Sequence, residues 1–149
     1  MKKTITFILA LLSFTTAFAQ WKYKTVDNGF DKKFKIAYVE DATDNFVKLF
    51  GGAGEPIGML LYTGFNCEED PTVEIALLVG ANWEKYEVTG TLSEDRKKVF
   101  ITYDISIMVD DFKSSSLMRV RHNDGHCGTR IYEFNMSGST AAYNFINNP

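Results

Sequence analysis

The feature that most constrains this fold is a succession of short, strand-like segments separated by turn-forming residues. Residues 21–26 alternate aromatic and basic side chains with a period of two, which is typical of a half-buried β-strand. The Asn28-Gly29 pair that follows is a strong hairpin signal, because both residues tolerate positive φ. Further strands are expected at 34–39, 46–50, 57–62, 72–79, 85–89, 97–103, 117–122 and 129–136.

This pattern predicts a mainly β fold with a single domain. Eight or nine strands at a spacing of about 8–12 residues are typical of an antiparallel β-sandwich or a small barrel. Residues 105–116 fit either a strand or a loop with one helical turn around 110–113. A short C-terminal helix is expected after Ser137-Gly138-Ser139, because apolar residues then recur at helical spacing: Ala141, Ala142, Phe145 and Ile146. A chain of 149 residues that is 45% hydrophobic can form one domain with an apolar core.

Residues 1–19 are predicted to be a secretory signal peptide. Lys2 and Lys3 form a basic start, residues 5–14 form an apolar stretch, and Ala17-Phe18-Ala19 supplies the small residues that precede a cleavage site. The apolar stretch is about half of the ~20 residues that a spanning helix needs, so a retained membrane anchor is the less favoured alternative. Cleavage would leave a β-sandwich domain at 20–149. We therefore expect an exported, soluble bacterial protein of the periplasm or the extracellular medium.

The charge balance indicates which classes of partner are disfavoured. The chain has 16 basic and 19 acidic side chains, and loss of Lys2 and Lys3 with the signal leaves 14 basic ones and a net charge of −5. A mildly acidic surface disfavours nucleic acid and anionic lipid as partners. No later apolar run is long enough to span a bilayer, so no membrane span is expected after signal cleavage.

Export changes how the two cysteines are interpreted. An oxidising compartment allows Cys67 and Cys127 to form a disulfide, which would close a long loop and stabilise the fold. The alternative is a pair of reduced, buried thiols. A reactive catalytic cysteine is the least favoured of the three interpretations.

Both histidines lie in one polar segment, at 121–130. His122 and His126 are four residues apart, with Asp124 and Cys127 beside them, and all of these residue types can bind zinc or copper. The spacing would suit a helix, but the segment is predicted to be a hairpin loop, and a disulfide would compete for Cys127. A turn with no bound metal is the simpler interpretation, and no cofactor is expected.

A possible anion or partner contact lies on the same strand. Arg119 and Arg121 are two residues apart and therefore share one face, where they could hold a carboxylate or a phosphate. The alternatives are a solvated face or cross-strand ion pairs with acidic neighbours such as Glu133. The same alternation places Met118, Val120 and His122 toward the core, with His122 as a half-buried structural residue.

The C-terminal part of the chain resembles a known family. The resemblance rests on Phe112, on Ser116-Leu117-Met118-Arg119-Val120-Arg121, and on the run from Tyr132 through Phe134, Met136 and Gly138 to Ala141-Ala142. This pattern is similar to the end of small exported β-sandwich proteins of the invasion-associated locus B type and their type VI secretion-associated relatives. The resemblance covers about the last forty residues of the chain. It implies a fold and a compartment, with no catalytic motif to carry across, and the paired cysteines are placed differently from the family's.

The residues favour a binding protein over an enzyme. The chain has neither the Gly-x-Ser-x-Gly nor the His-Glu-x-x-His motif. Our first hypothesis is a non-catalytic protein-interaction module of the cell envelope, with aromatic residues as contact anchors: Trp21, Tyr23, Trp83 and Tyr86. Core packing is the alternative role for these four. The second hypothesis is a small-ligand carrier with a closed, aromatic-lined pocket, and the third is a metal-binding protein that uses His122 and His126.

Overall fold

The computed structural model describes residues 21–27, 33–52, 55–62, 64, 66–67, 69, 71–101, 105–123 and 125–148. The predicted signal peptide, the Asn28-Gly29 turn and Asp124 lie outside the described residues. The described strands form two separate antiparallel sheets, so the fold is a β-sandwich rather than a small barrel.

The six-stranded sheet has the strand order β1-β2-β3-β4-β8-β7. Its strands span Lys22–Asp27 (β1), Lys33–Glu40 (β2), Phe46–Gly52 (β3), Glu55–Tyr62 (β4), Lys98–Ile101 (β8) and Thr91–Leu92 (β7). The four-stranded sheet has the order β10-β9-β5-β6. Its strands span Thr129–Asn135 (β10), Ser115–Asn123 (β9), Thr72–Val79 (β5) and Asn82–Thr89 (β6).

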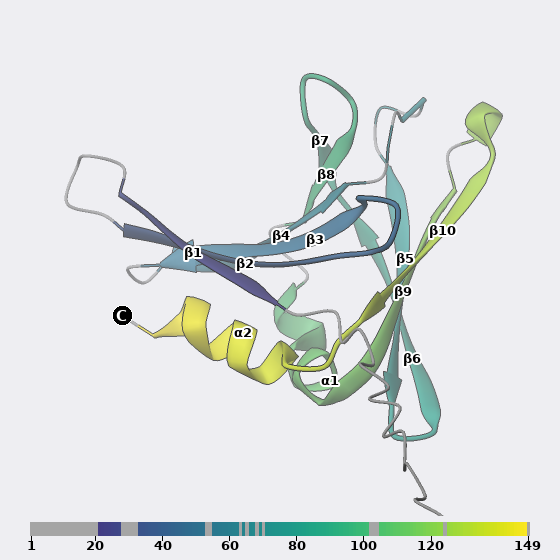
Figure 1. Cartoon of the computed structure of the whole chain (residues 1–149). Coiled ribbons are helices and arrows are strands. Elements are labelled where there is room, and N and C mark those ends of the chain that lie inside the picture. The colour runs from purple at the N-terminus through teal and green to yellow at the C-terminus, as the bar shows by residue number, and fades with distance from the viewer. Residues whose placement is uncertain are drawn as a thin grey trace, which may run out of the picture.

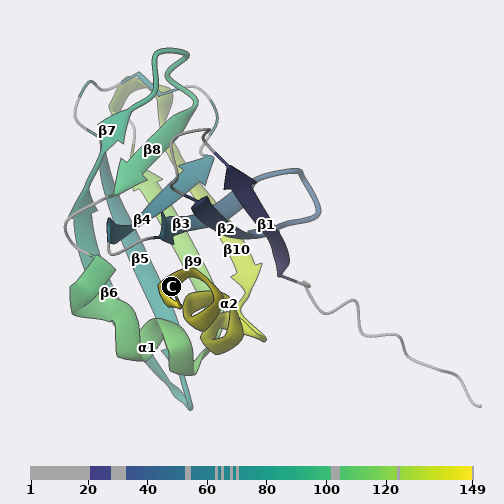
Figure 2. The same ribbon diagram turned by 90° about the vertical axis from the view of Figure 1, so that its left-hand side faces the viewer.

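The two sheets cross at a steep angle, as Figures 1 and 2 show, and the helices occupy the corner between them. One predicted ambiguity is resolved there: residues 105–114 are helical, as a 3-10 turn, η1 (Ile105–Met108), followed by α1 (Val109–Ser114). Asp110 and Asp111 in the first turn of α1 and Lys113 in its last turn complement the helix dipole. The C-terminal helix, α2 (Ser139–Asn147), lies beneath β1 and β2 in Figure 1. A second 3-10 turn, η2 (Gly125–Cys127), joins β9 to β10.

The core lies between the inner faces of the two sheets. Along β5, for example, Val73, Ile75 and Leu77 are fully buried, while the residues between them are partly exposed. Such alternation is expected of a sheet that covers a core with one face only. The other fully buried large residues are Leu49, Met59, Leu61, Ile101, Met108, Phe112, Met118, His122, Met136 and Ile146.

Hydrogen bonds join the start of α2 to the end of α1. The hydroxyl groups of Ser139 and Thr140 donate hydrogen bonds to the Lys113 carbonyl, at 3.2 and 2.7 Å, and so satisfy a carbonyl at the C-terminal end of α1. Gly138 occupies the N-cap position of α2 with φ 92°, a left-handed conformation that favours glycine. The expected Ser137-Gly138-Ser139 start of this helix is therefore correct.

Trp21, the first described residue, is part of the core. Its side chain is 3% exposed and packs edge-on against Phe112 of α1, with ring centroids 5.9 Å apart. The chain thus enters the core at Trp21, one residue before β1 begins.

We predict that Trp21→Ala lowers the free energy of unfolding by about 3–5 kcal/mol, because it leaves a cavity beside Phe112. Tyr23→Ala is the matched control: Tyr23 is 47% exposed and packs edge-on against Phe145, so we expect a loss of about 1 kcal/mol. Urea denaturation of both variants measures the difference. Equal losses would contradict the placement of Trp21 in the core.

Candidate functional site

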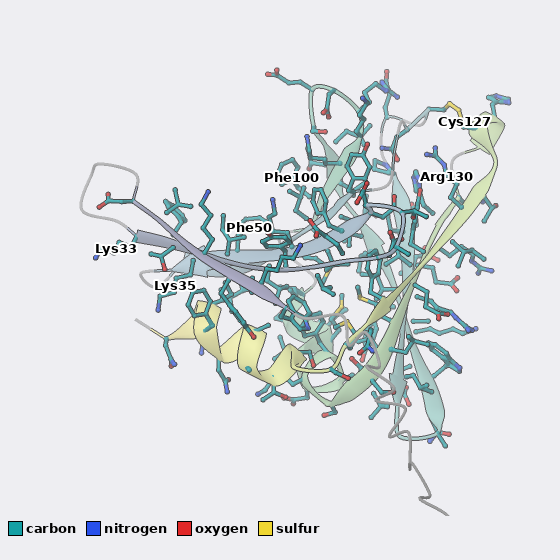
Figure 3. All side chains as sticks on the ribbon, in the orientation of Figure 1. Lys33, Lys35, Phe50, Phe100, Cys127 and Arg130 are labelled. Carbon is teal, nitrogen blue, oxygen red and sulfur yellow. A yellow bond between two sulfur atoms is a disulfide. The ribbon has the colours of Figure 1, made fainter. Side chains whose placement is uncertain are left out.

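The two cysteines form the predicted disulfide. Cys67 follows β4 of the six-stranded sheet, and Cys127 ends η2, near the tip of the β9–β10 hairpin (Figure 3). Their Cα atoms are 6.0 Å apart, and 60 residues separate them in the chain. The bond therefore ties a loop of one sheet to a hairpin of the other.

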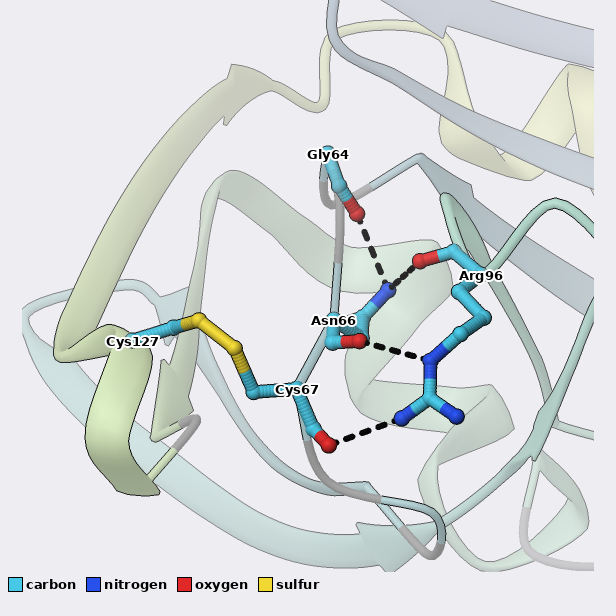
Figure 4. Close-up of a disulfide and its surroundings, with 5 residues drawn as sticks. All are labelled: Gly64, Asn66, Cys67, Arg96 and Cys127. Carbon is cyan, nitrogen blue, oxygen red and sulfur yellow. Dashed lines mark hydrogen bonds between the residues drawn. A yellow bond between two sulfur atoms is a disulfide. The ribbon is translucent and has the colours of Figure 1, made fainter.

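Arg96 lies in the turn between β7 and β8 and hydrogen-bonds to the segment that contains Asn66 and Cys67 (Figure 4). Its Nε and Nη2 atoms donate hydrogen bonds to the carbonyls of Asn66 and Cys67, at 2.9 and 2.7 Å. In return, the fully buried Asn66 side chain donates to the carbonyls of Arg96 and Gly64, at 2.5 and 2.9 Å. Sequence analysis missed this network, because residues 66 and 96 are far apart in the chain and nothing in the local pattern connects them.

The two histidines lie in different environments. His122 is on the inner face of β9 and is fully buried, deeper than the half-buried position expected of it, whereas His126 is exposed on η2. Cys127, the expected neighbour of a metal, is in the disulfide. Among the described residues, no group of three or more His, Cys, Asp and Glu side chains is placed to hold a metal ion.

Arg119 and Arg121 lie on the outer face of the four-stranded sheet, as their alternation with buried Met118, Val120 and His122 predicts. Each forms a cross-strand ion pair. Arg119 Nε lies 2.8 Å from a carboxylate oxygen of Glu133 on β10, and Arg121 pairs with Glu74 on β5. The pairing of Arg119 with Glu133 is the expected alternative to a bound anion.

An open concavity of about 410 Å³ lies over this part of the sheet. We call it the Trp83 trough and define it by the residues that line it: Glu74, Ala76, Trp83, Lys85, Arg119, Arg121 and Ile131. A second concavity, of about 650 Å³, shares Glu74 and Arg121 with the trough and extends it toward Asn123 and Thr129. Both lie on the outer face of the sheet, whereas the carrier hypothesis requires a closed pocket.

The apolar part of the trough depends on the small side chain of Ala76. Ala76 is directly between Arg119 and Lys85 in the strand register, and Trp83 lies one step along β6 from Lys85 on the same face. The guanidinium carbon of Arg119 lies over the Trp83 ring, 4.6 Å from its centroid. Ile131, opposite Arg121 on β10, is 64% exposed. A cation–aromatic pair and an exposed isoleucine thus line the same concavity from opposite edges of the sheet, with Trp83 on β6 and Ile131 on β10.

The four expected aromatic anchors have different roles. Trp21 packs in the core, and Tyr23 lies against Phe145. Tyr86 donates a hydrogen bond to Asp111 of α1, and this bond raises the pKa of the Tyr86 hydroxyl to about 12. Only Trp83, of these four, is in the trough. Ile131, which sequence analysis did not select, is the other large apolar side chain there.

No protein-family model and no curated protein sequence matches this chain. Among solved structures, the fold is similar to the crystal structure of invasion associated protein B from Bartonella henselae. The TM-score is 0.62 and the sequence identity 12%, over 85% of this chain and 91% of that chain. At this identity the similarity shows the fold alone, and it agrees with the family resemblance of the C-terminal residues. None of the described helices is long and apolar enough to cross a bilayer.

We predict that the ion pair between Arg119 and Glu133 contributes less than about 1 kcal/mol to stability, because both side chains are 50% exposed. A double-mutant cycle with Arg119→Ala and Glu133→Ala, followed by urea denaturation, measures the coupling. A coupling energy above about 2 kcal/mol would show that this pair is a structural element of the sheet.

We also predict that the double variant Cys67→Ser/Cys127→Ser unfolds with a free energy about 4 kcal/mol lower, because the unfolded chain is no longer closed into a 60-residue loop. The natural chain, unfolded with and without reductant, is the control, and the reduced form should match the variant. A difference below about 1 kcal/mol would contradict a disulfide that constrains the unfolded state.

Proposed function

We propose that this chain is an exported, non-catalytic binding module of the bacterial cell envelope, and that it binds another envelope or extracellular protein in the Trp83 trough. The observation that carries the proposal is one open concavity on the outer sheet face, which is lined by the half-buried Trp83, the exposed Ile131, and Arg119 and Arg121. Tryptophan and arginine are the residue types that most often dominate binding energy in protein interfaces.

The arginines of the trough can exchange the carboxylates with which they pair for groups of a bound protein. Arg119 and Arg121 are about half exposed, and exposed pairs of this kind stabilise a fold very little. A partner carboxylate or carbonyl can therefore replace Glu133 or Glu74 at small cost, while apolar side chains of the partner cover Trp83 and Ile131. The expected partner segment combines apolar residues with acidic or carbonyl groups.

Export is supported by features of the sequence and of the fold. The predicted signal peptide precedes a domain with a disulfide, which persists in oxidising compartments. The C-terminal residues resemble a family of exported proteins, and the fold is similar to that of invasion associated protein B. A non-catalytic role is consistent with His122, which is enclosed in the core where a substrate does not reach it.

A small-ligand carrier is the second candidate. The concavities of about 410 and 650 Å³ lie in the size range of small-molecule sites. Such sites usually bury most of the ligand, however, and these are open on the sheet surface. The protein partner is therefore the favoured occupant.

Photo-crosslinking tests the proposal in the cells that make the protein. A photoreactive phenylalanine analogue replaces Ile131 in one variant and Ile107 in another, since these side chains are 64% and 63% exposed and lie on different elements. We expect a discrete protein adduct from position 131 only, and we expect Trp83→Ala to reduce its yield about tenfold, as for a central aromatic contact.

Adducts of equal yield from positions 131 and 107 would contradict the trough as the binding site. If position 131 gives no protein adduct but a small-molecule extract of the envelope changes the tryptophan fluorescence of the purified protein, and Trp83→Phe abolishes this change, the carrier would replace the protein-binding module.

A further inference from the structure

The outer face of the six-stranded sheet is rich in aromatic residues. Buried residues such as Val47 and Leu49 point to the core, while their neighbours in the strands point outward and are half-buried. Five outward aromatic residues lie close together across β2, β3, β4 and β8: Tyr38, Phe46, Phe50, Tyr62 and Phe100. None of the five is among the candidate residues that the sequence indicated.

Four of the aromatic side chains pack against one another in two pairs. Phe46 stacks on Tyr62 with centroids 5.4 Å apart, and Phe50 packs edge-on against Phe100 at 6.4 Å. The Phe50 ring lies over Gly58, where any Cβ atom would collide with it. Gly58 therefore gives the ring space to lie flat on the sheet.

Lysines surround these rings. Lys48 Nζ lies 4.8 Å from the Phe46 centroid and 5.8 Å from that of Tyr38, and Lys22 Nζ lies 5.4 Å from Tyr38. The strand register places Lys24 and Lys98 on the same face. We call these four lysines and the five aromatic residues the aromatic–lysine face. Two carboxylates pair with lysines of this face: Glu40 pairs with Lys22, and Asp95 of the turn between β7 and β8 lies 3.0 Å from Lys98.

The helices of the fold pack on the opposite side of this sheet. Phe145 of α2 lies against Tyr23, and a Cβ on Gly51 would meet Ile146 at 3.1 Å, so α2 covers the inner ends of β1 and β3. Lys35 also donates to the Asn148 carbonyl at the end of α2, at 2.6 Å. Figure 3 shows Lys35 on the side of α2 and Phe100 on the opposite side of the sheet. None of the described helices covers the aromatic–lysine face.

The chemistry of this face selects among possible occupants. A second copy of the chain, related by a two-fold axis, would bring the central Lys48 residues together, which like-charge repulsion disfavours. Protein interfaces are depleted in lysine, whereas lysines with long apolar stems beside aromatic rings suit a membrane–water interface. Since Glu40 and Asp95 pair with two of the four lysines, Lys24 and Lys48 leave an excess of positive charge on this face, which favours an anionic partner.

We propose that the aromatic–lysine face docks the protein onto anionic lipid surfaces, with the lysines at the headgroups and the rings against the interfacial layer. The domain at 20–149 has a net charge of −5, so the excess of positive charge on this face orients the molecule. Screening limits the repulsion from the remaining acidic groups to about 8 Å at physiological salt. This surface is distinct from the Trp83 trough, which lies on the other sheet.

Vesicle sedimentation of the purified chain 20–149 tests the proposal. We expect binding to vesicles of phosphatidylcholine with phosphatidylglycerol, little binding to phosphatidylcholine alone, and a decrease with added salt. Lys24→Glu/Lys48→Glu should weaken binding roughly thirtyfold or more, since each lysine lost near an anionic surface accounts for about fivefold. Lys85→Glu/Lys113→Glu is the matched control, because it changes the net charge equally but off this face, and it should retain most of the binding.

A fluorescence readout locates the contact independently of the charge variants. In a Trp83→Phe background, Phe100→Trp should be quenched by brominated anionic lipid, whereas the same background without Phe100→Trp should not. Urea denaturation verifies that each variant is folded.

Three results would overturn the proposal. The first is no binding to anionic vesicles at low salt, and the second is an equal loss of binding in the two double-lysine variants. The third is a dimer in solution that Lys24→Glu/Lys48→Glu dissociates, which would assign this face to a second copy of the chain.

Discussion

Each sheet of this protein can bury only one of its faces against the other, and the rest of the structure depends on that constraint. Strands that alternate inward and outward side chains supply a shared core, closed at one corner by α1 and α2. The outer faces of both sheets are then left for solvent or for partners. The disulfide between Cys67 and Cys127 joins the segment that follows β4 to the tip of the β9–β10 hairpin, and so connects the two sheets.

The two outer faces have different chemistry, and this difference supports two separate roles. The four-stranded sheet presents paired charges around Trp83 and Ile131, which suits a protein segment that replaces exposed ion pairs. The six-stranded sheet presents aromatic rings beside more lysines than carboxylates, which suits an anionic surface. The net negative charge of the chain argued against lipid only because it averages over both sheets and their loops.

Much of the fold could be predicted from the sequence, because period-two alternation and Gly-containing turns define strands locally. Strand 34–39 shows the limit: Ile36 and Tyr38 alternate with Ala37 and Val39, so both faces are apolar and the pattern does not indicate which one the core covers. Contacts between residues far apart in the chain could not be predicted either. The bond of Arg96 to the Cys67 carbonyl and the packing of Trp83 beneath Arg119 depend on strand order, which no local pattern specifies.

The central claim is that this protein acts through its outer sheet faces, and hydroxyl-radical footprinting tests it most directly. Side-chain oxidation would be compared between the purified protein and the protein in its native envelope. The account predicts protection of Trp83 and Ile131 on one sheet and of Phe50 and Phe100 on the other, with no change at the exposed Ile107. Equal oxidation of all five residues in the two samples would contradict the account.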